Sequence, residues 1–339
     1  MKQLAIISLA VLFIASPALA DRFLWLPENG QIGVWEVQAS GSNQVAVINA
    51  PALDGVLDAN GYRATGGGQH PITGQIYVTA KYYDAAWSAT SKLLRYEQSN
   101  AGDGDFDFLG MDDLNYTPYG GSFGKDNSFY YTSYSNGLHK FDTVTKAQSQ
   151  VNATSIGNAM DVAIEGGYAF VTLAANPAKA IKVVKISTGD RVGDIYDEGA
   201  SQGGSGIDFG PDGLLYTAKY SSGSNDQLLS WDIKTDGVID ESKFTSVVPT
   251  VEHQYQWWQK ITYVRYNDED EMMSMSWNDS TIRPVRYNSS QNWDLHGNMA
   301  WANVSHPAQH FFADPNLTPE PATLLVLGLG LGAGLIRRR

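Results

Sequence analysis

The chain has 339 residues, with 23 lysines and arginines against 36 aspartates and glutamates and a formal net charge of −13. An acidic chain lacks the basic stripe that nucleic-acid binding requires, so we expect no nucleic-acid partner. The absence of cysteine excludes thiol catalysis, thiolate metal sites and disulfide bonds, and it leaves stability to a large hydrophobic core.

The first twenty residues read as a secretory signal peptide. Lys2 supplies a positive charge, residues 4–14 are an apolar run, and Ala18 and Ala20 form the small-x-small pattern of a cleavage site. The apolar run is too short for a comfortable membrane span. We therefore expect cleavage before Asp21 and export of the remainder, with an uncleaved N-terminal anchor as the alternative.

Two short phrases recur along the body of the chain. The first is an apolar strand that often ends in a charge, and the second is a Tyr- and Thr-rich strand that precedes it and follows a tight-turn signal. Copies of the first begin at Ile32, Leu93, Leu138, Ile181, Leu228 and Ile282, and copies of the second at Ile76, Tyr130, Phe170, Leu215 and Met272. Units of about 40–50 residues with four short antiparallel strands are typical of β-propeller blades.

The repeats predict an all-β fold, a β-propeller over residues 21–317, most simply with six blades. Seven blades are the alternative because the 61-residue interval between the first two copies has room for extra strands, and a large β-sandwich is a second alternative. Closing the ring requires the strand at residues 22–26 to pair with the C-terminal region around residues 293–312. Such closure removes the exposed strand edges that an open sheet would have.

One acidic segment suggests a calcium site. Asp103, Asp105 and Asp107 alternate as calcium ligands do, but Phe106 and Phe108 occupy the places between them. In a strand, the same alternation points the aspartates outward and the phenylalanines into the packing. Calcium is thus a weaker candidate than a plain strand, and no other cofactor is expected.

Other metal and catalytic patterns are weaker still. Residues 232–240, DIKTDGVID, have acidic spacing, but Asp-Gly at the centre more simply predicts a hairpin. His296, His306 and His310 do not form a helical ligand pair, because a proline follows His306. The sequence contains no Gly-x-Ser-x-Gly, phosphate-binding glycine loop or His-Glu-x-x-His, so no catalytic residue is assigned.

A ligand site is expected at the mouth of the central channel, where the innermost strands of a propeller begin. Aligning the units places there Gln69, His70, Tyr119, Asn158, Asp161, Gln202, Asp208, Trp257, Trp258 and Gln259. Aromatic faces with amide and carboxylate neighbours suit a sugar ring or another neutral polar ligand. Packing of Trp257 and Trp258 between blades is the alternative use of these residues.

Residues 204–220, GSGIDFGPDGLLYTAKY, resemble the blade phrase of NHL-type and gluconolactonase-like propellers. In that phrase a glycine-apolar pair opens the innermost strand, a Pro-Asp-Gly turn follows, and a Tyr-bearing strand comes next. The resemblance implies a propeller fold, which hosts many unrelated activities. The lactonases of the group carry Glu-Gly-Pro in the first blade, whereas residues 23–33 here read FLWLPENGQIG, which speaks against lactonase chemistry.

The C-terminal segment, residues 318–339, is an apolar run between charged ends. Residues 323–336 would form a helix ~21 Å long, shorter than a hydrocarbon core of ~30 Å, so the run makes a poor permanent anchor. Its three parts resemble the PEP-CTERM sorting signal: Pro319, Glu320 and Pro321, the apolar run, and Arg337, Arg338 and Arg339. The resemblance implies transient membrane insertion, recognition by exosortase and cleavage near Pro-Glu-Pro in a Gram-negative bacterium.

Together these features predict an exported binding or matrix protein, displayed at the cell surface or secreted, whose partner is extracellular polysaccharide or another surface protein. A metal-dependent lactonase or hydrolase, with a channel metal held by Asn158, Asp161 and Asp208, is the enzymatic alternative. A structural spacer without a ligand is the third.

Overall fold

The structure is a computed structural model of the full chain. It describes residues 23–28, 31–38, 41–49, 63–83, 89–98, 106–152, 156–173, 180–196, 204–210, 212–219, 226–255, 258–266, 269–276, 281–287, 293–295, 299–300 and 312–314. Nearly all of these residues lie in strands or in the connections between them, and one short 3₁₀ helix, η1 (Glu241–Lys243), is the exception.

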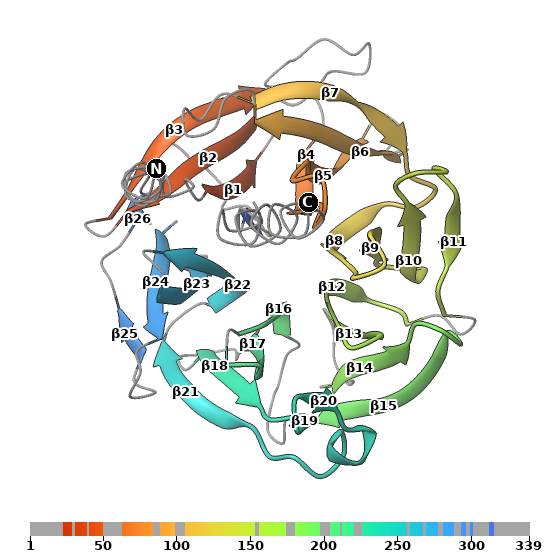
Figure 1. Ribbon diagram of the computed structural model, residues 1–339, viewed down its shortest axis with the longest axis vertical. Coiled ribbons are helices and arrows are strands. Elements are labelled where there is room, and N and C mark those ends of the chain that lie inside the picture. Colours follow the sequence, from red (N-terminus) through yellow and green to blue (C-terminus); the bar gives the residue numbers. More distant parts are fainter. Residues whose placement is uncertain are drawn as a thin grey trace, which may run out of the picture.

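In this described part, six sheets of four or five strands lie around a common axis (Figure 1). We call each sheet a blade and number blades 2 to 6 in chain order. Blade 2 is β4 (Arg63–Gln69), β5 (Ile76–Tyr83), β6 (Ala89–Gln98) and β7 (Phe106–Asp113); blade 3 is β8 (Pro118–Phe123), β9 (Ser128–Ser133), β10 (Gly137–Asp142) and β11 (Gln148–Gln150); blade 4 is β12 (Ala159–Glu165), β13 (Tyr168–Leu173), β14 (Ala180–Lys185) and β15 (Asp190–Tyr196). Blade 5 is β16 (Gly204–Phe209), β17 (Leu215–Lys219), β18 (Asp226–Trp231) and β21 (Thr250–Tyr255), and blade 6 is β22 (Trp258–Tyr266), β23 (Glu269–Ser276), β24 (Thr281–Tyr287) and β25 (Trp293–Leu295), with β26 (Met299–Ala300) also paired to β24.

Blade 1 closes the ring by combining both ends of the folded body. Its strand order is β27 (Phe312–Asp314), β1 (Phe23–Glu28), β2 (Gln31–Gln38) and β3 (Gly41–Asn49). In the antiparallel register, Phe23 lies opposite Asp314 and Trp25 opposite Phe312. The predicted pairing of the first strand with the C-terminal region is confirmed, at the far limit of the predicted range.

The two repeated phrases have fixed places in the blades. Every copy of the first phrase forms a third strand, namely β2, β6, β10, β14, β18 or β24, and every copy of the second forms a second strand, β5, β9, β13, β17 or β23. The 61-residue interval contains β3, β4 and β5 among the described residues, a fourth, a first and a second blade strand, as in the other intervals; the last interval also contains β19, β20 and η1. A ring of such sheets confirms the propeller prediction, and the sandwich alternative is wrong.

Aromatic and aliphatic side chains between neighbouring blades form the core. One cluster joins blades 4 and 5 and includes Phe170, Phe209 and Trp231. Burying each such side chain stabilises the fold by about 1.5–3 kcal/mol. All six residues of β9 are buried, because the blades on either side cover both faces of this strand.

A hydrogen-bonded device supports the hairpin between first and second strands. In blade 3 the Tyr130 hydroxyl donates to Asp126 Oδ2 over 2.9 Å, and the Ser128 N–H donates to Asp126 Oδ1 over 3.3 Å. A Cβ atom added to Gly124 would lie 2.7 Å from the Tyr130 ring, so the turn requires glycine there. Blade 5 repeats the device with Gly210, Asp212 and Tyr216, whose hydroxyl donates to Asp212 Oδ2 over 2.6 Å.

Candidate ligand-binding site at the channel mouth

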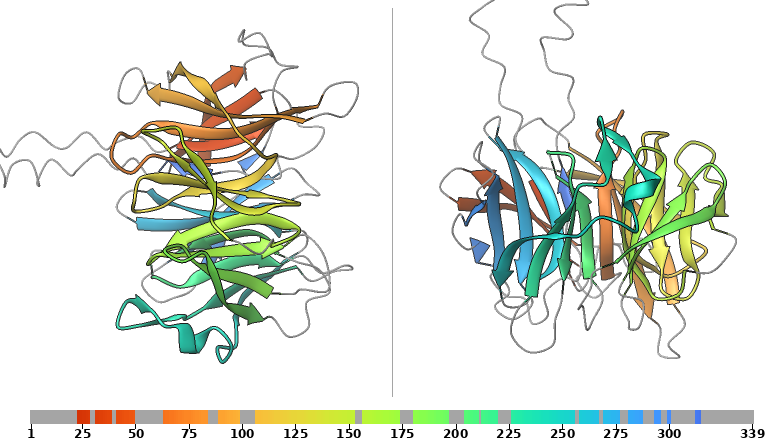
Figure 2. Two further views of the ribbon diagram at one scale, coloured as in Figure 1. Left: turned by 90° about the vertical axis from the view of Figure 1, so that its right-hand side faces the viewer. Right: turned by 90° about the horizontal axis from the view of Figure 1, so that it is seen from below.

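The two ends of the ring differ in the parts of the chain that form them. The strands run between these ends (Figure 2), and the innermost strands β4, β8, β12, β16 and β22 all begin at one end. We call that end the mouth face. We call the opposite end, where tight turns join the first and second strands, the turn face.

Part of the predicted site lies at the mouth face. Tyr119 is the second residue of β8, Asn158 immediately precedes β12, and Trp258 and Gln259 open β22. The side chains of Trp258 and Gln259, and all of Gln202 and Trp257, lie outside the described residues. For Trp257 and Trp258, both ligand binding at the channel mouth and packing between blades therefore stay predictions.

The predicted placement of Gln69 and His70 at the start of a strand is wrong. β4 begins at Arg63 and ends at Gln69, so both residues lie at the turn face. The misplacement follows from the three glycines at residues 66–68, which erase the side-chain alternation that marks a strand. Asp208, the last residue but one of β16, also lies toward the turn face.

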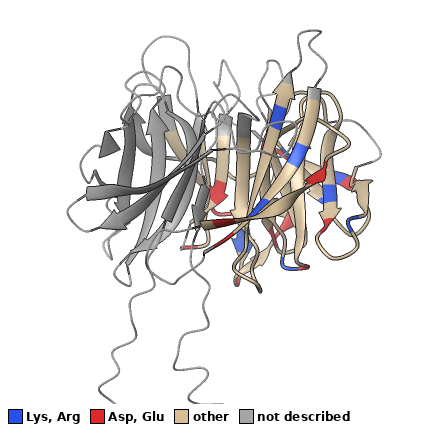
Figure 3. Ribbon diagram, turned by 90° about the horizontal axis from the view of Figure 1, so that it is seen from above, with Lys and Arg blue, Asp and Glu red and all other residues tan. Residues whose placement is uncertain are grey.

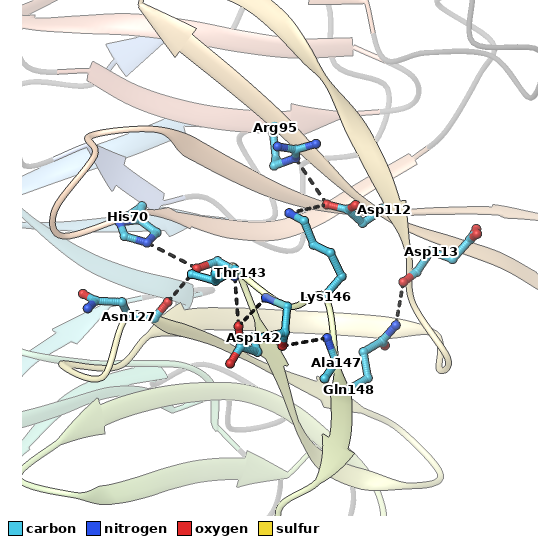
Figure 4. Close-up of polar contacts among 12 residues, drawn as sticks. His70, Arg95, Asp112, Asp113, Asn127, Asp142, Thr143, Lys146, Ala147 and Gln148 are labelled. Atoms are coloured by element: carbon cyan, nitrogen blue, oxygen red, sulfur yellow. Dashed lines mark hydrogen bonds and ion pairs between the residues drawn. The ribbon is translucent and has the colours of Figure 1, made fainter.

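His70 organises the turn that it enters. Its Nδ1 accepts the N–H groups of Ile72 and Thr73, each over 3.2 Å, and its Nε2 lies 3.4 Å from Thr143 Oγ1 in blade 3 (Figure 4). Only 6% of its surface is exposed, and desolvation lowers the pKa of His70. The histidine thus joins blades 2 and 3.

An ion-pair network reinforces the same junction. Asp112 Oδ2 lies 3.2 Å from Arg95 Nε and 3.1 Å from Lys146 Nζ of blade 3 (Figure 4), and Gln148 Nε2 donates to the Asp113 carbonyl over 2.7 Å. The ion pair between Asp112 and Lys146 therefore connects blades 2 and 3. Elsewhere along the described blades, acidic and basic residues are also intermingled (Figure 3).

Asp161 is buried between blades. It is fully buried on β12, and its Oδ2 accepts the Ile207 N–H of blade 5 over 3.2 Å. A Cβ atom on Gly120 of blade 3 would lie 2.3 Å from Asp161 Oδ1, so this carboxylate wedges between three innermost strands. Glycine at residue 120 is what leaves room for it.

The proposed metal trio does not come together. Asn158 lies at the mouth face, whereas Asp208 lies toward the turn face, where its Oδ1 accepts the Phe209 N–H. Within the described residues, no three histidine, aspartate or glutamate side chains are grouped so that they could hold a metal ion.

A compact cluster at the mouth face combines two predicted residues with two that the sequence did not single out. Lys81 Nζ lies 4.1 Å from the centroid of the Tyr119 ring, and the Tyr119 and Tyr134 ring centroids are 5.7 Å apart. The Asn158 N–H donates to the Tyr134 carbonyl over 2.5 Å. We call Lys81, Tyr119, Tyr134 and Asn158 the Tyr119 cluster.

Each member of the Tyr119 cluster comes from a different element. Lys81 lies near the end of β5, Tyr119 is the second residue of β8, Tyr134 follows β9, and Asn158 precedes β12. Asn158 has φ 62°, a left-handed conformation that asparagine tolerates better than most residues. The cluster therefore spans blades 2, 3 and 4, and Tyr134, 40% exposed, presents an aromatic surface to solvent.

The sequence held a weak signal for Tyr134 and none for Lys81. Tyr134 directly follows a second strand, in the polar turn 133–137, and an exposed tyrosine in such a turn is a reasonable contact residue. Lys81 is brought over Tyr119 only by the packing of blade 2 against blade 3, which no local pattern encodes.

Two acidic segments have structural roles where they are described. Asp107 is exposed on β7 between the less exposed Phe106 and Phe108, as a strand predicts. The hairpin prediction for residues 232–240 is confirmed by β19 (Lys234–Thr235) and β20 (Val238–Ile239), joined through Asp236 and Gly237 with φ of 50° and 77°. Residues 1–20, Asp103, Asp105, His296, His306, His310 and residues 318–339 lie outside the described residues.

The sequence matches no protein family, and no curated protein is similar to it. Solved structures are similar in fold. A chain from a crystal structure of a nidogen/laminin complex has a TM-score of 0.60 at 9% identity, covering 86% of this chain and 98% of that chain. The Cps50 (Swd1) β-propeller domain of Myceliophteria thermophila has a TM-score of 0.52 at 9% identity, covering 86% and 87%.

Virginiamycin B lyase from Staphylococcus aureus has a TM-score of 0.49 at 14% identity, covering 84% of this chain and 86% of that chain. At these identities the similarities concern the fold alone. Six sheets around one axis, closed by pairing of the two chain ends, and the likeness to the Swd1 domain lead to one conclusion. The chain is a β-propeller.

Proposed function

We propose that this β-propeller is an exported, non-catalytic binding protein whose ligand, a neutral polar saccharide of an extracellular polysaccharide, lies on the Tyr119 cluster. The observation that carries the proposal is the exposed Tyr134 ring beside Tyr119, with Lys81 Nζ over the Tyr119 ring and the Asn158 N–H bonded to the Tyr134 carbonyl. Aromatic rings offer large apolar contact area with little conformational freedom to lose, and the polar groups beside them fix orientation.

The two histidines whose side chains the structure describes have structural roles. Desolvation lowers the pKa of His70 and of His139, to about 4 for His139, and both imidazoles are buried in contacts between strands or blades. Burial opposes ionisation of Asp126, but hydrogen bonds from Lys140 and Tyr130 hold its pKa below the usual value. These shifts have structural causes away from the Tyr119 cluster.

Export and sorting form the second part of the proposal. The signal peptide directs the chain out of the cytoplasm, and the segment 318–339 holds the precursor in the membrane until an exosortase cleaves it near Pro319-Glu320-Pro321. No helix among the residues that the structure describes is long and apolar enough to cross a membrane. The mature protein is then displayed at the surface or released.

The rival functions make different demands on the site. A gluconolactonase-like enzyme needs a metal in the channel. Asn158 and Asp208 lie toward opposite faces of the ring, so they do not form one shared metal site. A protein partner is the second binding alternative, since one similar chain comes from a nidogen/laminin complex.

Titration of the exported protein with polysaccharides from a glycan array, followed by calorimetry, tests the proposal. Tyr119→Ala or Tyr134→Ala removes an aromatic face and weakens affinity by about 0.5–1.5 kcal/mol, roughly twofold to twelvefold. Val144→Ala, on the exposed turn 142–147 at the turn face, is the matched control and leaves affinity unchanged. Equal losses in all three variants, or an array without hits, contradict the proposal. Stoichiometric channel metal would favour the enzyme.

A further inference from the structure

Both ends of the folded body lie at the turn face. β27 is the innermost strand of blade 1, so it runs from the mouth face to the turn face like the other innermost strands, and it ends at Asp314. Phe23, the first residue of β1, is paired opposite Asp314. The chain that continues toward residues 318–339 therefore departs from the turn face, close to the ring axis.

Three of the six exposed large hydrophobic side chains among the described residues lie in turns at the same face. Ile72 is 73% exposed in the β4–β5 turn, Val144 85% in the β10–β11 turn, and Val238 69% in the β19–β20 hairpin that follows β18. Among the described residues, the large hydrophobic side chain that is exposed at the mouth face is that of Tyr134, whose hydroxyl makes it amphipathic. Removing such aliphatic side chains from water is favourable, so these turn tips can contribute to a contact with an apolar phase.

We infer that the turn face is a membrane-contacting surface: while the tail is inserted, the aliphatic turn tips touch the lipid headgroup region and the mouth face points away from the bilayer. This inference rests on the proposed insertion of residues 323–336. It places the Tyr119 cluster where polysaccharide is accessible even before the tail is cleaved.

The length of the tether decides between the two orientations. Nine steps of chain from Asp314 to Thr323 reach at most roughly 30 Å. To turn the mouth face toward the bilayer, the tether would pass outward across three strand spacings and then along a seven-residue strand, roughly 37 Å in all. The tether is shorter than this outer route, which favours the orientation with the turn face toward the membrane.

Carboxylates near these turns are held by partners within the protein. Asp126 lies 2.7 Å from Lys140 Nζ, and Asp142 Oδ1 accepts the N–H groups of Val144 and Thr145 over 2.9 and 2.8 Å. Engaged carboxylates of this kind hold the turn tips in a fixed shape. The aliphatic tips are thereby presented on turns of fixed shape.

The absence of cysteine allows single labels at the two faces. The full chain carrying Val144→Cys or Tyr134→Cys is labelled with a donor dye and added to vesicles of phosphatidylcholine with a minority of phosphatidylglycerol, containing an acceptor-labelled lipid. We expect clearly stronger energy transfer from residue 144 than from residue 134. If the protein binds the vesicles but energy transfer is equal for the two labels, or stronger from residue 134, the proposed orientation is wrong. That result would not contradict insertion of the tail.

Further variants distinguish membrane insertion of the tail from contact between the turn face and lipid. Removing residues 319–339 should abolish most vesicle association; unchanged association contradicts tail insertion itself. In the full chain, Ile72→Ser with Val144→Ser should weaken vesicle partition roughly tenfold, whereas Tyr134→Ser should leave it unchanged. If the double variant binds vesicles like the parent chain, the turn tips do not touch lipid. A full chain that does not associate with vesicles overturns both the insertion and the orientation.

Discussion

The turn face and the mouth face of the ring are held together by different kinds of contact. At the turn face, residues of one hairpin form hydrogen bonds with each other, as in the Gly124, Asp126 and Tyr130 device and its copy in blade 5. At the mouth face, the Tyr119 cluster draws one residue from each of four separate connections or strand ends. The comparison teaches that a repeated local device builds the fold at one end, while the candidate site at the other end depends on neighbouring blades.

The largest difference should appear between two glycines. Gly124→Ala at the turn face places a Cβ 2.6 Å from Asp126 Oδ1 and 2.7 Å from the Tyr130 ring, and we expect a loss of about 3 kcal/mol in unfolding free energy. At the mouth face Gly157 has no atom within 4 Å of the same position, so Gly157→Ala should cost under about 0.5 kcal/mol. Urea unfolding of both variants measures the pair. Equal losses would mean that the two faces are not built differently.

Acidification should act on the interior of blade 3, between the two faces. His139 is 1% exposed, stacks 4.1 Å from Tyr116 and 5.1 Å from Tyr131, and its Nε2 has no hydrogen-bond partner among the described residues. Burial lowers the pKa of His139 from 6.5 to about 4. The unfolded chain therefore binds the extra proton first as the pH falls through 6.5, and stability decreases.

Between pH 7 and pH 5 this single group should remove about 2 kcal/mol of unfolding free energy. Stability from this group is fully present above pH 6.5 and is lost progressively down to about pH 4. His139→Phe keeps an aromatic ring in the stack and cannot be protonated. Unfolding curves at both pH values should show a smaller pH effect in the variant, and an identical pH effect in both proteins contradicts the assignment.

Removing one tyrosine hydroxyl at each face should change the stability of the two faces by different, smaller amounts. Tyr130→Phe deletes the bond to Asp126 and should cost about 1 kcal/mol of stability without changing ligand affinity. Tyr134→Phe at the exposed mouth face should leave stability within about 0.5 kcal/mol of the parent. Thermal unfolding and calorimetry of the two variants test this, and a stability loss that is larger for Tyr134→Phe reverses the comparison.

The sequence predicts the turn face better than the mouth face, for a physical reason. Strands and tight turns are local, so the Asp236-Gly237 hairpin and the positions of second and third strands follow from short phrases. The glycine run in β4 removes that local information, and Gln69 was misplaced as a result. Lys81 meets Tyr119 and Asp161 meets Gly120 only through packing of neighbouring blades. The number of blades stays a prediction.

Hydrogen exchange of the exported protein with and without a bound polysaccharide tests the central claim most directly. The account predicts slower exchange of backbone amides in residues 133–137 and 156–159 at the mouth face, and no change in residues 124–127 and 142–147 at the turn face. Protection confined to the turn-face segments, with the mouth-face segments unchanged, would contradict it.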